Sequence, residues 1–135
     1  MARLIDTSVI IELERRGRPA EFLSVLAAAE PLALSSITAA ELLMGVERAD
    51  SITRRQQRSA FVESALGIVP VLPFDLLVAR VHARVGALML VSGQPIGSND
   101  LLIAATALTY GMSVLTENLR DFQRVPGLTV HRLDW

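Results

Sequence analysis

Residues 4–11 read LIDTSVII, and this stretch decides how the rest of the chain is expected to fold. An apolar run leads into a single acid, two hydroxyl residues follow, and a second apolar run begins. The pattern predicts a buried strand that ends at Asp6 and a helix that starts just after it. Asp6 then stands at the carboxyl end of a strand, where open α/β sheets place their ligands.

The composition excludes several classes of protein. All basic residues are Arg, so a Walker P-loop and a Schiff-base lysine are absent. There is no Cys, which excludes disulfides and thiolate zinc sites. The net charge of −1 gives no global attraction to nucleic acid. Asp6 has no lysine to pair with, and a buried carboxylate needs a partner.

Length and hydropathy predict one domain, residues 1–135, with its own core. Hydrophobic residues make up 51% of the chain, which is high for a small monomer and indicates a surface that a partner buries. No signal peptide precedes the first strand, and the longest uncharged run, residues 101–116, is short for a bilayer. The sequence therefore predicts a soluble, cytoplasmic protein without a membrane span.

Expected strands and helices alternate along the chain. The expected strands are 3–5, 32–34, 68–72, 113–116 and 128–130. The expected helices are 8–16, 19–29, 38–49, 54–66, 76–93 and 100–111. Thr7 or Ser8 is expected to cap the first helix, Pro70 confines its strand to an edge, and residues 117–127 are expected to form an irregular loop. Such alternation predicts a three-layer α/β/α sandwich with a mostly parallel sheet of four or five strands.

Three further acids follow strands as Asp6 does. Glu41 lies in the first or second turn of the helix after the second strand, Asp100 in the first turn of its helix, and Asp121 after the fourth strand. Because parallel strands share one carboxyl edge, these acids can meet in one cleft although they are far apart in sequence.

Four carboxylates gathered in one cleft require a compensating charge. Two unit charges about 4 Å apart repel by about 4 kcal/mol at an effective dielectric near ~20. A divalent cation reverses that sign, and hard oxygen ligands favour Mg²⁺ or Mn²⁺ over zinc. An ion of this kind can hold a phosphodiester, activate a water and stabilise the leaving oxygen.

Three of the acids also have an ordinary structural explanation. Residues 38–41, TAAE, match a capping box in which Glu41 satisfies a helix end. Asp100 suits any helix N-terminus, and Asp121 suits a solvated loop.

Blocks around the acids resemble the PIN domain nucleases, and within them the VapC toxins of bacterial toxin–antitoxin pairs. The blocks are LIDTS (4–8), SITAAEL (36–42) followed by Gly45, IGSNDLLIAA (96–105), LTENLRDF (115–122) and VPGL (125–128). They occur in order and span the whole chain.

The resemblance implies an endoribonuclease that depends on Mg²⁺ or Mn²⁺, acts on RNA such as tRNA, and is blocked by a cognate VapB-like antitoxin. We also expect a homodimer. By position, Asp6, Glu41 and Asp100 are the core acids. The fourth is Asp121 or Glu117, and the form of the last block favours Asp121.

The resemblance also assigns supporting roles around these acids. Thr7, Ser8 and Thr116 would orient carboxylates or water, and Asn118 would position a water. In the expected mechanism Asp6 and Asp100 hold the ion most directly, while Glu41 and Asp121 act through water or a second ion.

Two other functions compete with this interpretation. A haloacid-dehalogenase-like or receiver-like phosphotransfer domain also places an Asp after its first strand, but it usually has a second acid nearby and a Lys. Here Ser8 stands where the phosphatase has its second Asp. A catalytically silent PIN-like scaffold would bind RNA or protein without cutting, so it would not need the full set of four acids.

Arg54, Arg55 and Arg58 leave one question open. They form either a solvated helix face or a phosphate contact beside the cleft. Trp135 is also open to two explanations, as a cover for the sheet edge or as a dimer contact.

Overall fold

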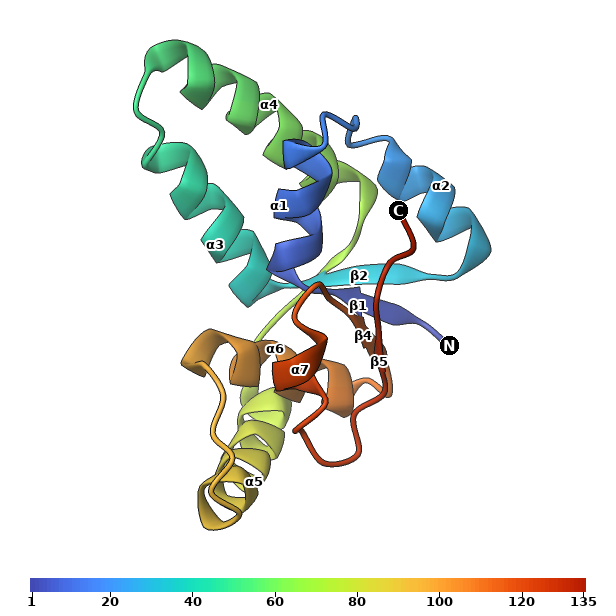
Figure 1. The fold of residues 1–135 in the computed structure, drawn as a ribbon, viewed down its shortest axis with the longest axis vertical. Coiled ribbons are helices and arrows are strands. Elements are labelled where there is room, and N and C mark those ends of the chain that lie inside the picture. Colours follow the sequence, from blue (N-terminus) through green and yellow to red (C-terminus); the bar gives the residue numbers. More distant parts are fainter.

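The computed structural model describes residues 1–135, and its centre is a sheet of five parallel strands in the order β3-β2-β1-β4-β5 (Figure 1). The strands are β1 (Arg3–Ile5), β2 (Leu32–Ser35), β3 (Val71–Leu72), β4 (Ser113–Leu115) and β5 (Val130–His131). The predicted parallel sheet is confirmed, and β3 is an edge strand as Pro70 requires.

Seven helices cover the two faces of this sheet. They are α1 (Thr7–Arg15), α2 (Phe22–Ala29), α3 (Ser36–Glu47), α4 (Ile52–Ile68), α5 (Leu76–Val91), α6 (Ser98–Thr109) and α7 (Leu119–Phe122). In Figure 1, α1 to α4 lie above the sheet and α5 to α7 lie below it. The three-layer α/β/α sandwich is therefore confirmed.

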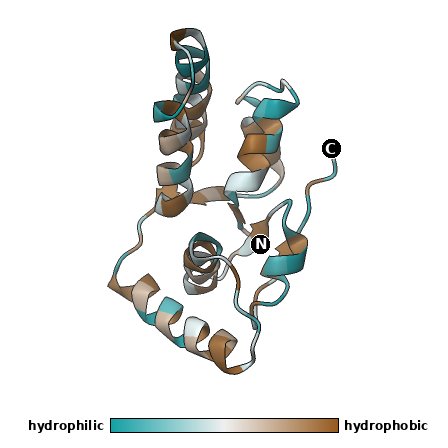
Figure 2. Ribbon diagram, turned by 60° about the vertical axis from the view of Figure 1, so that its left-hand side comes forward, coloured by the Kyte–Doolittle hydropathy of each residue, from teal (hydrophilic) through white to brown (hydrophobic).

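The strand β1 joins the two halves of the core. Successive side chains of a strand point to opposite faces, so Leu4 packs with the lower helices and Ile5 with the upper ones. Both side chains are fully buried, as expected for a parallel strand covered on both faces. Brown, hydrophobic segments gather where the helices meet the sheet in Figure 2.

Several local predictions were wrong. The first helix starts at Thr7, its N-cap position is Asp6, and no side chain caps it. Ser35 caps α3 by accepting from the Thr38 amide, so α3 begins at Ser36 rather than at Thr38, and the capping box that was the alternative explanation of Glu41 is absent. At the start of α1 bonding between distant side chains overrides the local pattern, whereas the cap of α3 is a local contact.

The C-terminal part also differs from the prediction. Residues 117–127 are not wholly irregular, because α7 forms a short helix there whose Phe122 is fully buried. The last strand lies at Val130–His131 rather than at residues 128–130, since it pairs in parallel with Val114 and Leu115.

None of the seven helices is both long enough and apolar enough to cross a lipid bilayer.

Candidate active site

The chain adds β2 and β3 on one side of β1, and then β4 and β5 on the other side, so the sheet has a topological switch point between β1 and β4. Asp6 lies at this switch point. The register pairs Ile5 with Leu115, so the residues that follow, Asp6 and Thr116, sit side by side at the carboxyl edge of the sheet. Open α/β sheets place their ligands in the crevice at such a switch point. Only 3% of Asp6 is exposed to solvent.

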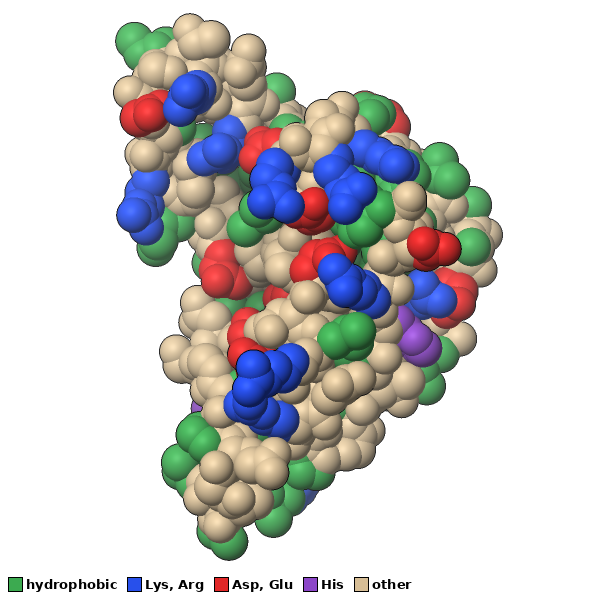
Figure 3. Space-filling view, viewed as in Figure 1, with side chains coloured by type: hydrophobic (Ala, Val, Ile, Leu, Met, Phe, Trp, Pro, Cys, Tyr) green, Lys and Arg blue, Asp and Glu red, His purple; other side chains and the backbone are tan.

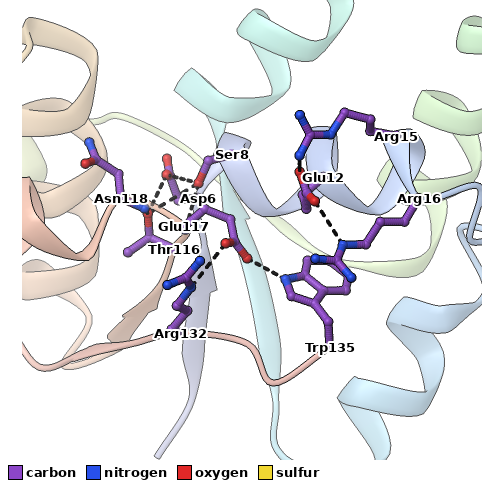
Figure 4. A network of polar contacts seen from close by, with 10 residues as sticks. All are labelled: Asp6, Ser8, Glu12, Arg15, Arg16, Thr116, Glu117, Asn118, Arg132 and Trp135. Atoms are coloured by element: carbon purple, nitrogen blue, oxygen red, sulfur yellow. Dashed lines mark hydrogen bonds and ion pairs between the residues drawn. The ribbon is translucent and has the colours of Figure 1, made fainter.

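Two hydroxyl groups hold the carboxylate of Asp6. Ser8 Oγ and Thr116 Oγ1 donate to Asp6 Oδ2 over 2.6 and 2.8 Å, distances typical of hydrogen bonds to a charged acceptor (Figure 4). No hydrogen bond reaches the other oxygen, Oδ1. The buried charge is thus anchored on one side and available to a ligand on the other.

The two hydroxyls are themselves oriented by the backbone after β4. The amide of Glu117 donates to Ser8 Oγ over 3.0 Å, and the amide of Asn118 donates to Thr116 Oγ1 over 2.8 Å. Each hydroxyl accepts from one loop amide and gives its proton to Asp6. The loop therefore fixes the direction in which both donors point.

Glu41 lies in the second turn of α3 and is held by α1. Thr7 Oγ1 donates to Glu41 Oε1 over 2.6 Å and lies 3.0 Å from Thr38 Oγ1. Thr7 follows Asp6 directly in sequence, so this bond draws Glu41 toward the end of β1. Thr38 is fully buried and contacts Thr7 through its hydroxyl. In the sequence the same residue resembles the cap of a helix.

Asp100 and Asp121 share one neighbour, the side-chain amide of Asn118. Asn118 Nδ2 lies 3.4 Å from Asp100 Oδ2 and 3.1 Å from Asp121 Oδ2. Asp100 is in the first turn of α6, as predicted, whereas Asp121 lies in α7 rather than in a loop. Arg124 also lies 3.6 Å from Asp121 Oδ1.

The electrostatics of Asp100 show that the other three acids act on it. Burial, which is the largest cause, and the charges of Asp6, Glu41 and Asp121, in that order, together raise the pKa of Asp100 from 3.8 to about 6. The hydrogen bond from Asn118 partly opposes this rise. The structure therefore brings all four acids into one negative field.

Glu117, the other candidate for the fourth acid, is held elsewhere. Trp135 Nε1 donates to Glu117 Oε1 over 2.6 Å, and Arg132 Nε lies 3.3 Å from Glu117 Oε2 (Figure 4). Both carboxylate oxygens thus have partners in the C-terminal segment.

The donor set fits a hard cation. It consists of carboxylate oxygens without His or Cys, which suits Mg²⁺ or Mn²⁺. No three of these side chains close around one point as a complete set of protein ligands. Mg²⁺ does not need such a cage, because it usually keeps several waters and binds one or two carboxylates together with substrate phosphates.

Figure 3 shows acidic side chains in the hollow between the upper and lower helical layers, with arginines above and below them. The arginines of α4 are paired: Arg54 with Asp50 at 3.1 Å, Arg55 with Glu47, and Arg58 with Glu14 at 3.3 Å. This pairing favours the solvated helix face over a free phosphate contact.

Thr38, Arg132 and Trp135 are the residues around the site that the sequence interpretation missed. A buried Thr within an apparent capping box gave no separate signal. The two C-terminal residues lie 11 and 14 positions beyond Asp121, the nearest acid of the site in sequence.

The sequence matches the model of the PIN domain family over residues 3–128. It is 38% identical over 130 residues to Ribonuclease VapC1 of Rickettsia felis, covering 96% of this chain and 95% of that protein. It is 34% identical over 104 residues to the tRNA(fMet)-specific endonuclease VapC of Salmonella typhimurium, covering 77% and 75%.

The fold agrees with these sequence matches. The crystal structure of VapBC2 from Rickettsia felis, bound to a DNA fragment from its promoter, superposes with a TM-score of 0.88 at 25% identity and covers 99% of this chain and 100% of that one. The chain therefore belongs to the PIN domain family and, within it, to the VapC ribonucleases.

Proposed function

We propose that this protein is the ribonuclease toxin of a type II toxin–antitoxin pair and hydrolyses RNA phosphodiester bonds with the help of Mg²⁺ or Mn²⁺. The observation that carries the proposal is that burial and the charges of Asp6, Glu41 and Asp121 together raise the pKa of Asp100 to about 6, which requires the four acids to lie near one another. A divalent cation would offset the repulsion among these carboxylates. In this proposal, residues 1–135 form one domain that acts in the cytoplasm.

Asp6 and Asp100 are the proposed direct ligands, and Glu41 and Asp121 act through water or a second ion. Support for Asp6 comes from its free Oδ1, opposite the oxygen that Ser8 and Thr116 hold. When bound, the ion would lower the pKa of a water molecule and neutralise charge on the phosphate.

The residues around the acids orient them. Ser8 and Thr116 keep Asp6 in one rotamer, and Thr7 does the same for Glu41. The amide of Asn118 separates the carboxylates of Asp100 and Asp121 and stabilises their charged forms. Fixed positions matter because an in-line attack on phosphorus requires the reacting atoms to be aligned.

Asp121 is the proposed fourth acid. Asn118 ties it to Asp100, and its charge contributes to the raised pKa of Asp100. Glu117 is not among the groups that raise that pKa, and Trp135 and Arg132 occupy its carboxylate.

The proposed substrate is an RNA loop, with tRNA as the first candidate. The support is the relative from Salmonella typhimurium, whose name states that it cuts tRNA(fMet). A tRNA, a messenger RNA and a ribosomal RNA can be compared directly by sequencing the ends of RNA after controlled expression.

A VapB-like antitoxin is the proposed protein partner, and a groove between α1, α3 and α4 is its proposed seat. Ile10, Leu42 and Phe61 line this groove, Glu41 lies at one end, and Ile11 at its rim is 53% exposed. Ile10 and Leu42 are already buried in the free protein, so an amphipathic helix would mainly cover Ile11 and the partly exposed Phe61. Leu43 is exposed while Leu42 and Val46 are buried, so only part of that stripe is available.

A homodimer is proposed through α5. This helix exposes large hydrophobic side chains at both ends, and the corresponding segments are brown in Figure 2: Leu76, Leu77, Leu88, Leu90 and Val91. Leu88→Asp is expected to convert a dimer to a monomer, measured by sedimentation velocity.

The central test measures metal binding and RNA cutting in the same preparation. Mg²⁺ is expected to raise the melting temperature without RNA present, because an ion that binds only the folded state stabilises it. RNA is expected to be cut with Mg²⁺ and to stay intact with EDTA. Metal binding without cutting would favour the silent scaffold, and transfer of a phosphoryl group to Asp6 would favour the phosphotransfer domain.

A further inference from the structure

The C-terminal segment reaches the loop that follows β4 and holds one side chain of it (Figure 4). Trp135 donates its indole proton to Glu117 Oε1 over 2.6 Å, and Arg132 lies 3.3 Å from Glu117 Oε2. Glu117 is therefore restrained at both carboxylate oxygens by residues outside the acid cluster.

Trp135 is itself fixed from two sides. Its ring stacks on Phe22 of α2, with ring centroids 6.5 Å apart and an angle of 17° between the planes. The guanidinium of Arg16 lies 4.6 Å from its ring centroid, a cation–π contact. Arg16 is held in turn by Glu12 at 2.9 Å. Contacts with α2 and with Arg16 at the end of α1 therefore fix the direction of the indole N–H.

The backbone of Glu117 continues the connection to Asp6. The Glu117 amide donates to Ser8 Oγ over 3.0 Å, and Ser8 Oγ donates to Asp6 Oδ2 over 2.6 Å. The side chain of Glu117 rotates about its own bonds, but while its carboxylate is held the backbone can shift only as far as those rotations allow. Holding the carboxylate of Glu117 therefore limits the movement of the amide that orients Ser8.

We propose that Trp135 and Glu117 are positioning residues, which fix the carboxylate of Asp6 through Ser8 and so strengthen cation binding at the acid cluster. The inference rests on the proposed function, because it assigns Asp6 to a cation. Glu117 acts in it as a structural link and not as a ligand.

The first variant is Trp135→Phe, which keeps an aromatic ring, although a smaller one, against Phe22 and Arg16 and removes the indole donor. Isothermal titration with Mg²⁺ alone is expected to show a dissociation constant about 3- to 10-fold higher than that of the wild type, somewhat below the effect of losing a direct hydrogen-bond partner of a ligand. The half-saturating Mg²⁺ concentration for RNA cutting is expected to rise by the same factor.

Two variants at Glu117 separate positioning from direct ligation. Glu117→Gln keeps an oxygen that accepts from Trp135, so its Mg²⁺ affinity is expected to stay within about twofold of the wild type. Glu117→Ala loses the acceptor and is expected to match Trp135→Phe. Trp135 is the only Trp in the chain, so its emission wavelength reports whether the ring stays in its seat.

The matched control is Phe74→Leu, which removes an edge-to-face aromatic contact with His82, with ring centroids 5.9 Å apart, and leaves Trp135, Glu117 and their contacts in place. It is expected to lower the melting temperature without changing Mg²⁺ affinity. An unchanged Mg²⁺ affinity in Trp135→Phe overturns the inference. Equal loss in Glu117→Gln and Glu117→Ala also overturns it, in favour of a ligand role. If the wild type binds no Mg²⁺ and cuts no RNA, the proposed function fails, and the inference fails with it.

Discussion

Thr116 Oγ1 donates a 2.8 Å hydrogen bond to Asp6 Oδ2, although 110 residues separate the two in sequence. The contact exists because β1 and β4 are neighbours in the sheet and their register pairs Ile5 with Leu115. Thr116 Oγ1 also accepts from the Asn118 amide. One hydroxyl therefore joins Asp6, at the end of β1, to the loop that carries Asn118, whose side chain lies beside Asp100 and Asp121.

Thr116→Val removes this hydroxyl and keeps the shape of the side chain. The Asn118 amide loses its acceptor in a buried place, so the free energy of unfolding is expected to fall by about 1–3 kcal/mol. The half-saturating Mg²⁺ concentration for RNA cutting is expected to rise about 10-fold. Thr116→Ser keeps the hydroxyl and serves as the control: an equal loss in both variants would contradict a role for the hydrogen bond.

Asp6→Asn is expected to lower RNA cutting by at least about 100-fold while the protein stays folded, because the substitution removes a proposed ligand charge and keeps an oxygen for Ser8 and Thr116. Cutting is measured as initial rate at saturating Mg²⁺, and folding by circular dichroism. The control Glu63→Gln removes one charge from an exposed position on α4 and is expected to cut at the wild-type rate. A rate in Asp6→Asn equal to that of the control would remove Asp6 from the mechanism.

The raised pKa of Asp100 predicts how stability depends on pH without a divalent cation. Between 3.8 and about 6 the folded state binds more protons at Asp100 than the unfolded state does. Stability from this group is therefore complete below the lower value and is lost as the pH rises through the higher one. Asp100→Asn removes the dependence, so the variant is expected to exceed the wild type in stability at pH 7.5 by about 1–2 kcal/mol, allowing for solvent screening.

Urea unfolding of both proteins at pH 4 and pH 7.5 measures this difference. The two are expected to converge at pH 4 in EDTA, and saturating Mg²⁺ is expected to reverse the order at pH 7.5, because the ion stabilises the charged form of Asp100. A difference that stays constant from pH 4 to 7.5 would mean that the ionisation of Asp100 is not its cause.

Ile11→Asp is expected to abolish inhibition by the antitoxin and leave RNA cutting within about twofold of the wild type. Ile11 is 53% exposed on α1 at the rim of the groove, so a charge there disturbs an apolar partner more than the fold. Inhibition is measured by adding the purified antitoxin to the cutting assay. Val25→Asp, on the exposed side of α2, is the control and is expected to stay inhibited.

Much of the fold could be predicted because local patterns determine it. The apolar runs before Asp6 and Thr116 are buried on both faces, which only a covered parallel strand allows. Asp75 caps α5 through a local pattern, since its side chain accepts from the Val78 amide. The position of Asp6 at the end of β1 follows from a local pattern as well, whereas Asp100 opens α6 after α5 and a loop.

Other features could not be predicted, because distant contacts override the local preference. The resemblance gives Thr7 and Ser8 a role in orienting carboxylates, but only the tertiary structure shows that Thr7 bonds to Glu41 and Ser8 to Asp6. The buried Phe122 stabilises α7 within a segment that has the composition of a loop. Trp135 faces Glu117 through a contact that no local pattern encodes.

The sequence by itself determined which residues end strands, and hence which carboxylates stand at the edge of the sheet, because hydrophobic periodicity is a local property of the chain. Only the tertiary structure decided which side chains meet there. Strand order and register bring Asp6 next to Thr116, and the two helical layers set Glu41, Asp100 and Asp121 in one field. Those contacts depend on packing between separate segments, 110 residues apart for Asp6 and Thr116 and 34 apart for Thr7 and Glu41, which alternating apolar and polar residues cannot specify.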